Sequence, residues 1–119
     1  MEKLTGHKKV KTAVFISGRG SNLKNLIKFS RTKRSPIIID LIIANKKVEG
    51  LKYARQYRID KTVIRYENVK IAEKKILTLL TKKKINFICL AGFMKVLSNN
   101  FIKKFKGKII NIHPSYLPK

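Results

Sequence analysis

The stretch TAVFISGRGSNLKNLI, residues 12–27, decides the fold that we expect for this chain. Residues 12–17 form an apolar run typical of a buried strand, and the later leucine and isoleucine residues recur at helical spacing. Gly18 and Gly20 lie at the junction. Because glycine adopts conformations that strain other residues, the junction predicts a tight turn between a strand and a helix.

The rest of the chain continues this alternation of strand and helix patterns. We expect strands at residues 12–17, 36–45, 61–64, 86–93 and 108–112. We expect helices from Ser21 onwards, at 50–57, at 69–84 and within 99–107. The run at 36–45 is nearly all apolar, which predicts a central strand covered on both faces. The order predicts an α/β fold, with a doubly wound, mostly parallel sheet and helices on both faces.

The composition indicates one globular domain, with 119 residues of which 44% are hydrophobic. No apolar run approaches the roughly 18 residues that a membrane-spanning helix needs, so we expect no membrane partner. The apolar run near the start is too short for a signal-peptide core. The single cysteine, Cys89, excludes an internal disulfide, and we expect a cytoplasmic protein.

The net charge of +23 is extreme, and a basic surface attracts nucleic acid and other anions. The lysines are scattered, however, and aromatic residues do not alternate with them in a stacking pattern. Charge alone is a non-specific signal. We therefore do not expect nucleic acid as the main partner, although the charge favours capture of an anionic small molecule.

The glycine turn at the end of the first strand has two possible roles. Backbone N–H groups at Gly18 and Gly20, with the unpaired N–H groups of the helix that starts near Ser21, form a typical phosphate site. The spacing is not that of a Walker loop, and Leu23 stands where a dinucleotide fingerprint has its third glycine. The pattern favours one phosphate, or else a turn that is needed only for packing.

A second group of polar residues follows the last expected strand. Asn111 and His113 are separated by one residue, so their side chains share a face if the strand continues. An amide and an imidazole suit a reaction in which negative charge develops on oxygen. The alternative is a histidine satisfied within the core. Because ligands bind beyond the carboxyl ends of parallel strands, this pair and the glycine turn are expected at one edge of the sheet. No cluster of metal ligands is present in the sequence, so we expect no metal.

Taken together, three segments carry a resemblance to a known family. ISGRGSNLKNLI, LAGFMKVLS and IINIHPSYLPK closely resemble phosphoribosylglycinamide formyltransferase, the folate-dependent enzyme of purine synthesis, in order and in spacing. The resemblance runs from about Lys11 to the last residue. It implies a Rossmann-like fold of the formyltransferase type. The implied reaction moves a formyl group from 10-formyltetrahydrofolate, the co-substrate, to the amino group of glycinamide ribonucleotide.

The resemblance also implies roles for individual residues. Those implied to hold the phosphorylated substrate are Gly20, Ser21, Asn22, Leu23, Lys24 and Pro114. Those implied to line the folate site, largely through the backbone, are Met94, Lys95, Val96 and Leu97. Asn111 and His113 are the implied catalytic pair: both would stabilise the oxyanion, and His113 would donate a proton.

The chain departs from the family pattern at several points. Lys95 stands where the family usually has arginine, which matters only if that side chain binds in a bidentate manner. A folate-contacting arginine of the family has no clear counterpart near residues 69–70. The family's catalytic aspartate and folate loop lie beyond Lys119. We therefore expect residues 1–119 to be one incomplete domain with a basic extension at 1–10, and this chain alone to be inactive or nearly so.

Several alternatives to this function stay open on the sequence. A formyltetrahydrofolate hydrolase and the methionyl-tRNA formyltransferase share the fold and the folate, but the SGRGSNL turn suits a small phosphorylated substrate better. A basic RNA-binding module without enzymatic activity, or a fragment without function, are the alternatives from other classes. The oligomeric state is not indicated by the sequence.

Overall fold

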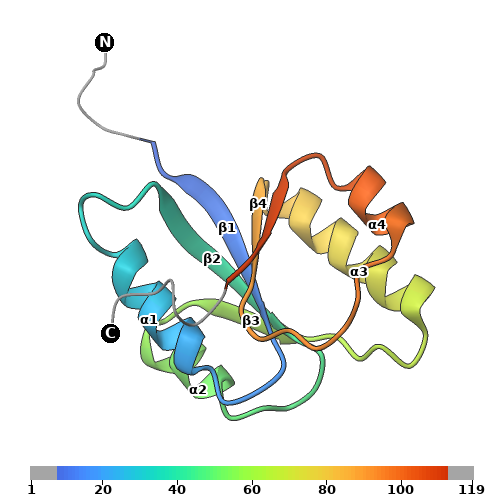
Figure 1. Cartoon of the computed structure of the whole chain (residues 1–119), viewed down its shortest axis with the longest axis horizontal. Coiled ribbons are helices and arrows are strands. Elements are labelled where there is room, and N and C mark those ends of the chain that lie inside the picture. The colour runs from blue at the N-terminus through green and yellow to red at the C-terminus, as the bar shows by residue number, and fades with distance from the viewer. Residues whose placement is uncertain (1–7, 113–119) are drawn as a thin grey trace.

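A parallel sheet of five strands organises the protein in a computed structural model that describes residues 8–112. The strands are β1 (Val10–Ile16), β2 (Ile37–Ala44), β3 (Asp60–Val63), β4 (Phe87–Leu90) and β5 (Lys108–Asn111). They lie in the order β3-β2-β1-β4-β5, and each neighbouring pair is parallel (Figure 1). The predicted parallel α/β sheet is confirmed.

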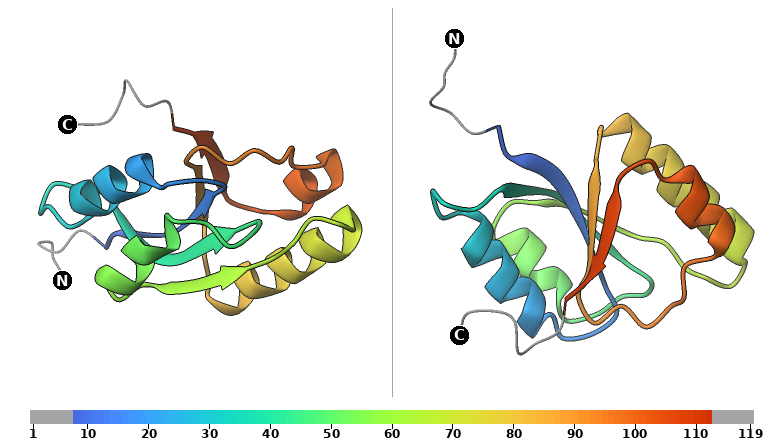
Figure 2. Two further views of the ribbon diagram at one scale, coloured as in Figure 1. Left: turned by 90° about the horizontal axis from the view of Figure 1, so that it is seen from below. Right: turned by 45° about the horizontal axis from the view of Figure 1, so that its top comes forward.

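Helices cover both faces of the sheet. They are α1 (Ser21–Ser30), α2 (Leu51–Gln56), α3 (Val69–Lys82) and α4 (Asn99–Lys104). The helices α1 and α2 pack on one face, whereas α3 and α4 pack on the other, as the right-hand view of Figure 2 shows. The sheet is therefore doubly wound, as the sequence predicts. None of these helices has the length and apolar character that crossing a membrane requires.

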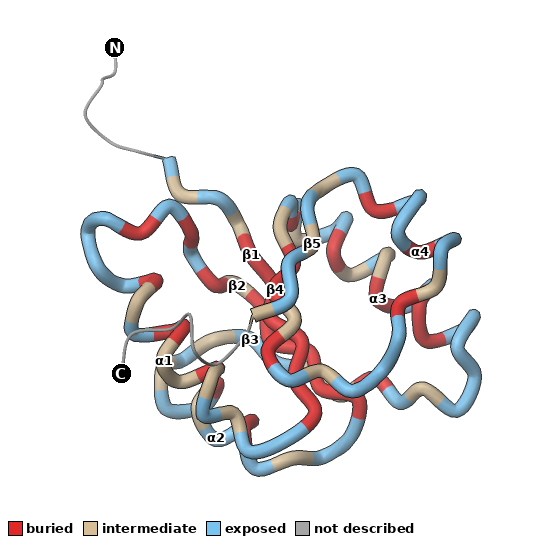
Figure 3. Tube along the Cα trace, in the orientation of Figure 1, coloured by how far each residue is buried: buried red, intermediate tan, exposed pale blue. Residues whose placement is uncertain are grey.

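The alternation of side chains along β1 divides the core into two halves. Ala13 and Phe15 pack against α3 and α4, whereas Val14 and Ile16 pack against α1 and α2. All four side chains are fully buried, because β1 has a neighbour on each edge and helices on each face. Figure 3 shows buried residues along the inner strands, while β5, which is 4 residues long, has only exposed and intermediate residues.

The strand β2 is a central strand, as predicted, but it differs from the prediction in coverage. It lies between β3 and β1 and pairs with both. The pairing with β1 shifts by one residue at Asp40, which opposes no residue of β1. Such a bulge reverses which face each later residue occupies. Only the part of β2 after Asp40 is fully covered, since Ile38 is exposed.

Element boundaries agree with the predictions to within a few residues. The strand β1 begins at Val10, so the last residue of the predicted 1–10 extension belongs to the sheet. The strand β4 ends at Leu90 rather than at residue 93, because the chain bends there and Gly92 has a positive φ of 71°. The helix α4 ends at Lys104 and does not reach Gly107.

Gly107 is required for the pairing of β5. The Lys108 N–H donates to the Asn86 carbonyl at 3.1 Å, and a Cβ on Gly107 would lie 1.9 Å from that carbonyl oxygen. We predict that Gly107→Ala lowers the free energy of unfolding by about 1–3 kcal/mol through this clash. Urea denaturation measures the change. The exposed neighbour Lys106 supplies the control, and an equal effect of Lys106→Ala would contradict the prediction.

Candidate active site at the carboxyl edge of the sheet

The carboxyl ends of three strands are level with one another. Phe15 of β1 pairs with Leu90 of β4, and Leu90 pairs with Asn111 of β5. Neighbouring strands lie about 4.8 Å apart, so β1 and β5 are separated by roughly 10 Å at this edge. The connections from β1 and β4 run to opposite faces of the sheet, which makes this edge the switch point where open α/β sheets bind ligands.

The turn between β1 and α1 is held against the start of α2. Gly20 is left-handed, with φ 82°, and a Cβ there would lie 2.7 Å from the Gly50 Cα. The Gly50 N–H donates to the Gly18 carbonyl at 3.0 Å. Packing therefore explains the glycine at position 20. It does not explain Gly18, since a Cβ there would meet no atom of residues 8–112 within 4 Å.

The first turn of α1 is open to an anion. Gly20 is its N-cap residue, and no side chain in the described part of the chain caps the helix or places an acid in its first turn. Ser21 is exposed and Asn22 is half-buried, whereas Leu23 is fully buried in the core. The unpaired N–H groups and the helix dipole make this turn favourable for a phosphate.

Lys24 is the last residue of the predicted substrate-binding turn, and its side chain lies near Tyr53. Its backbone N–H donates to the Gly20 carbonyl at 2.9 Å, which is the first hydrogen bond of the helix. Its ammonium group lies 5.8 Å from the centre of the Tyr53 ring, on α2. The side chain therefore rests over an aromatic face beside the turn.

Ser17 joins the glycine turn to the loop that follows β4. Its hydroxyl donates to Asn45 Oδ1 at 2.6 Å, and it accepts a hydrogen bond from the Met94 N–H at 2.8 Å. Ser17 and Asn45 are both buried. The ends of β1 and β2 and the loop after β4 are thus linked by one hydroxyl group.

The predicted folate-binding residues line a cavity together with Asn111. The cavity measures about 520 Å³, within the usual range for small-molecule sites. Its lining residues are Leu90, Phe93, Met94, Lys95, Val96, Leu97, Ile102, Ile109 and Asn111. Met94 and Val96 are 79% and 88% exposed, so this loop presents apolar side chains at the surface, whereas Leu97 is buried.

The structure therefore brings together part of the predicted site. Asn111 is exposed at the end of β5 and lines the same cavity as Met94 to Leu97. The residues from Gly20 to Lys24 do not line that cavity, but Ser17 joins their turn to Met94, which does line it. His113 and Pro114 lie outside the described residues, so their predicted roles stay predictions.

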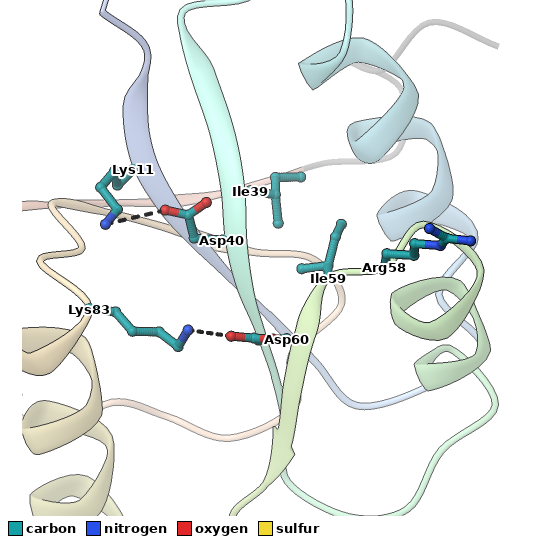
Figure 4. A pocket seen from close by; sticks show the side chains of 7 residues that line it. All are labelled: Lys11, Ile39, Asp40, Arg58, Ile59, Asp60 and Lys83. Atoms are coloured by element: carbon teal, nitrogen blue, oxygen red, sulfur yellow. Dashed lines mark hydrogen bonds and ion pairs between the residues drawn. The ribbon is translucent and has the colours of Figure 1, made fainter.

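A second hollow lies at the amino edge of the sheet, away from these residues. It measures about 230 Å³ and contains the ion pairs Lys11–Asp40 and Lys83–Asp60, at 3.5 and 2.5 Å (Figure 4). The hydrogen bond from Lys83, and then its charge, lower the pKa of Asp60. Both acidic residues of this hollow are thus already paired with a lysine.

Sequence reasoning did not single out Glu73 or Gly50. Glu73 lies on α3, is 5% exposed, and accepts hydrogen bonds from the Ser98 N–H and hydroxyl at 2.8 and 2.5 Å. The position of Glu73 within the apolar stripe of a helix is the feature of the sequence that could have identified it. No local pattern indicates that Gly50 meets Gly20.

Cys89 is buried, which raises the pKa of its thiol to about 12 and makes it a poor nucleophile.

Comparison with known proteins identifies the family. A family model described as formyl transferase matches residues 10–119. The chain belongs to the formyl transferase family. Its relatives include the trifunctional purine biosynthetic protein adenosine-3 of Homo sapiens, at 44% identity over 97% of this chain and 12% of that protein. They also include the phosphoribosylglycinamide formyltransferase of Haemophilus influenzae, at 39% identity over 92% of this chain and 53% of that protein.

Solved structures of this family have the same fold. The phosphoribosylglycinamide formyltransferase from Brucella melitensis superposes with a TM-score of 0.83 and 35% identity. The match covers 90% of this chain and 58% of that one. The chain thus spans little more than half the length of these bacterial formyltransferases. The Rossmann-like formyltransferase fold that the sequence predicts is confirmed.

The two glycines of the turn differ in the space around them. We predict that Gly20→Ala lowers the free energy of unfolding by about 1–3 kcal/mol, because of its positive φ and the contact with Gly50. Gly18→Ala is expected to leave unfolding unchanged, since its Cβ has open space. Thermal denaturation of both variants measures this difference. Equal destabilisation by the two substitutions would contradict the assignment.

Proposed function

We propose that the protein transfers a formyl group from 10-formyltetrahydrofolate to the amino group of N1-(5-phospho-D-ribosyl)glycinamide, in de novo purine synthesis. The proposal rests on the arrangement of two features at the carboxyl edge of the sheet. An uncapped helix start suited to phosphate and an apolar cavity containing Asn111 are joined there by Ser17. The names of the relatives, phosphoribosylglycinamide formyltransferase among them, support the same reaction.

The first turn of α1 would hold the phosphate of the ribonucleotide. Ser21, Asn22 and Leu23 supply backbone N–H groups that no described side chain caps. The open space at Gly18 supports close approach of a ligand to the backbone of the turn. The charge of +23 favours encounter with an anionic substrate. In this proposal Gly20 and Lys24 act by shaping the turn.

The cavity beside Asn111 would hold the pterin part of the folate. Its walls are mainly apolar, and the residues from Met94 to Leu97 line it. A flat ring with polar edges fits such a lining, since apolar walls bury the ring and backbone groups can form hydrogen bonds with the polar atoms at its edge. Lys95 is exposed on this loop. If only the backbone binds, lysine serves here as well as the arginine usual in the family.

Asn111 would act on the reacting carbonyl group. The amine nitrogen forms a bond to the formyl carbon, the bond from that carbon to N10 of the folate breaks, and one proton passes from the amine to N10. Negative charge develops on the formyl oxygen, and the Asn111 amide can donate a hydrogen bond to it. His113 is the proposed proton donor and second stabilising group. We also infer that the reaction takes place in the cytoplasm.

The reactions of related enzymes differ in the acceptor of the formyl group. A formyltetrahydrofolate hydrolase needs no phosphate site, and a methionyl-tRNA formyltransferase binds a much larger acceptor. The uncapped first turn of α1 favours the small phosphorylated acceptor. Binding of the ribonucleotide at this turn therefore separates the proposal from both alternatives.

Asn22 provides the test of this phosphate site. We predict that Asn22→Asp weakens binding of glycinamide ribonucleotide by about tenfold or more, because a carboxylate there repels the phosphate. Isothermal titration calorimetry on the intact protein measures the affinity. Asn25→Asp, on the next turn of α1, adds the same charge outside the first turn and is the matched control. An equal loss of affinity in both variants, or no binding by the wild type, would contradict the proposal.

A further inference from the structure

The segment from Met94 to Leu97 is attached at each end to a buried polar group. At its start, the Met94 N–H donates to the Ser17 hydroxyl at 2.8 Å. Immediately after its end, the Ser98 N–H donates to the Glu73 carboxylate at 2.8 Å. Between these two bonds the side chains of Met94 and Val96 are largely exposed, so apolar packing of these two side chains does little to hold the backbone.

The attachment at Ser98 satisfies several polar groups at once. The Ser98 hydroxyl donates to Glu73 at 2.5 Å and accepts from the Phe101 N–H at 3.0 Å, as the N-cap of α4. Both carboxylate oxygens of Glu73 thus bind one residue. A buried carboxylate is costly unless it is hydrogen-bonded, and hydrogen bonds to a charged acceptor are about twice as strong as neutral ones.

The attachment at Met94 has the same character. Ser17 is 6% exposed and its hydroxyl is oriented by the hydrogen bond that it donates to Asn45. Once that proton is directed at Asn45, the oxygen lone pairs of Ser17 face the Met94 N–H. The two attachments come from different elements, since Ser17 follows β1 and Glu73 lies on α3.

We propose that Ser17 and Glu73 are positioning residues that fix the backbone of residues 94–97 in the conformation that binds folate. The proposal rests on the proposed function for its ligand, but not for its geometry. A loop that binds its ligand through backbone groups binds more tightly when it is already ordered, because ordering the loop during binding reduces the affinity. Neither residue lines the folate cavity itself.

Amide hydrogen exchange on the intact protein tests the attachments without any ligand. We expect Ser17→Ala to accelerate exchange at Met94, and Glu73→Leu to accelerate exchange at Ser98, each by about tenfold. Ser17→Thr and Glu73→Gln keep a hydroxyl and an acceptor oxygen, and we expect them to restore most of the protection. Leu80→Ala is the matched control, because it opens a cavity at a buried position of α3 that forms none of these bonds.

Titration calorimetry of Glu73→Leu with each ligand tests the consequence for binding. We expect the Kd for 10-formylfolate to rise by about tenfold while the Kd for the ribonucleotide is unchanged, and Glu73→Gln to lie near the wild type. Exchange at Met94 and Ser98 that matches the Leu80→Ala control would overturn the proposal, and so would an equal rise in both Kd values. Wild-type protein that fails to bind 10-formylfolate would refute the proposed function, and the exchange comparison would still decide the role of Ser17 and Glu73.

Discussion

The pairing of β1 with β4 is the constraint on which the rest of the structure depends. The chain leaves β1 toward the face of α1 and leaves β4 toward the face of α4, so the two connections diverge beside one another. Divergent connections leave a crevice that helices cannot fill. Ser17, at the end of β1, joins the end of β2 to the loop after β4 through its hydrogen bonds with Asn45 and Met94. The glycine turn and the loop from Met94 to Leu97 are neighbours for that reason.

Close backbone contact shapes the turn between β1 and α1. Gly20 and Gly50 approach so closely that neither could carry a side chain without displacement of the backbone. The contact brings the start of α1 beside the start of α2 while leaving the first N–H groups of α1 uncapped. Packing thus accounts for Gly20, whereas it does not account for Gly18. Of the two interpretations that the sequence leaves open, packing applies to Gly20, and phosphate binding stays a proposal for the turn.

The sequence predicted the strands and helices because their apolar periods are strong, and it predicted which strand ends meet because parallel strands share an edge. It did not predict the register shift at Asp40, because an apolar run such as 36–45 does not reveal where a bulge falls. The bond between Glu73 and Ser98 joins residues 25 positions apart, and no period encodes such a contact. Asn111 was predicted as a site residue because it stands at a strand end, and it lines the cavity with Met94 to Leu97, whereas His113 lies outside the described residues.

The central claim is that both substrates meet at the carboxyl edge of the sheet. The most direct test is to map amide chemical shifts of the intact protein while glycinamide ribonucleotide and 10-formylfolate are added separately. The account predicts that the first ligand shifts Ser21 to Leu23, that the second shifts Met94 to Leu97, and that both shift Ser17. Shifts centred instead on Lys11, Asp60 and Lys83, at the opposite edge, would contradict it.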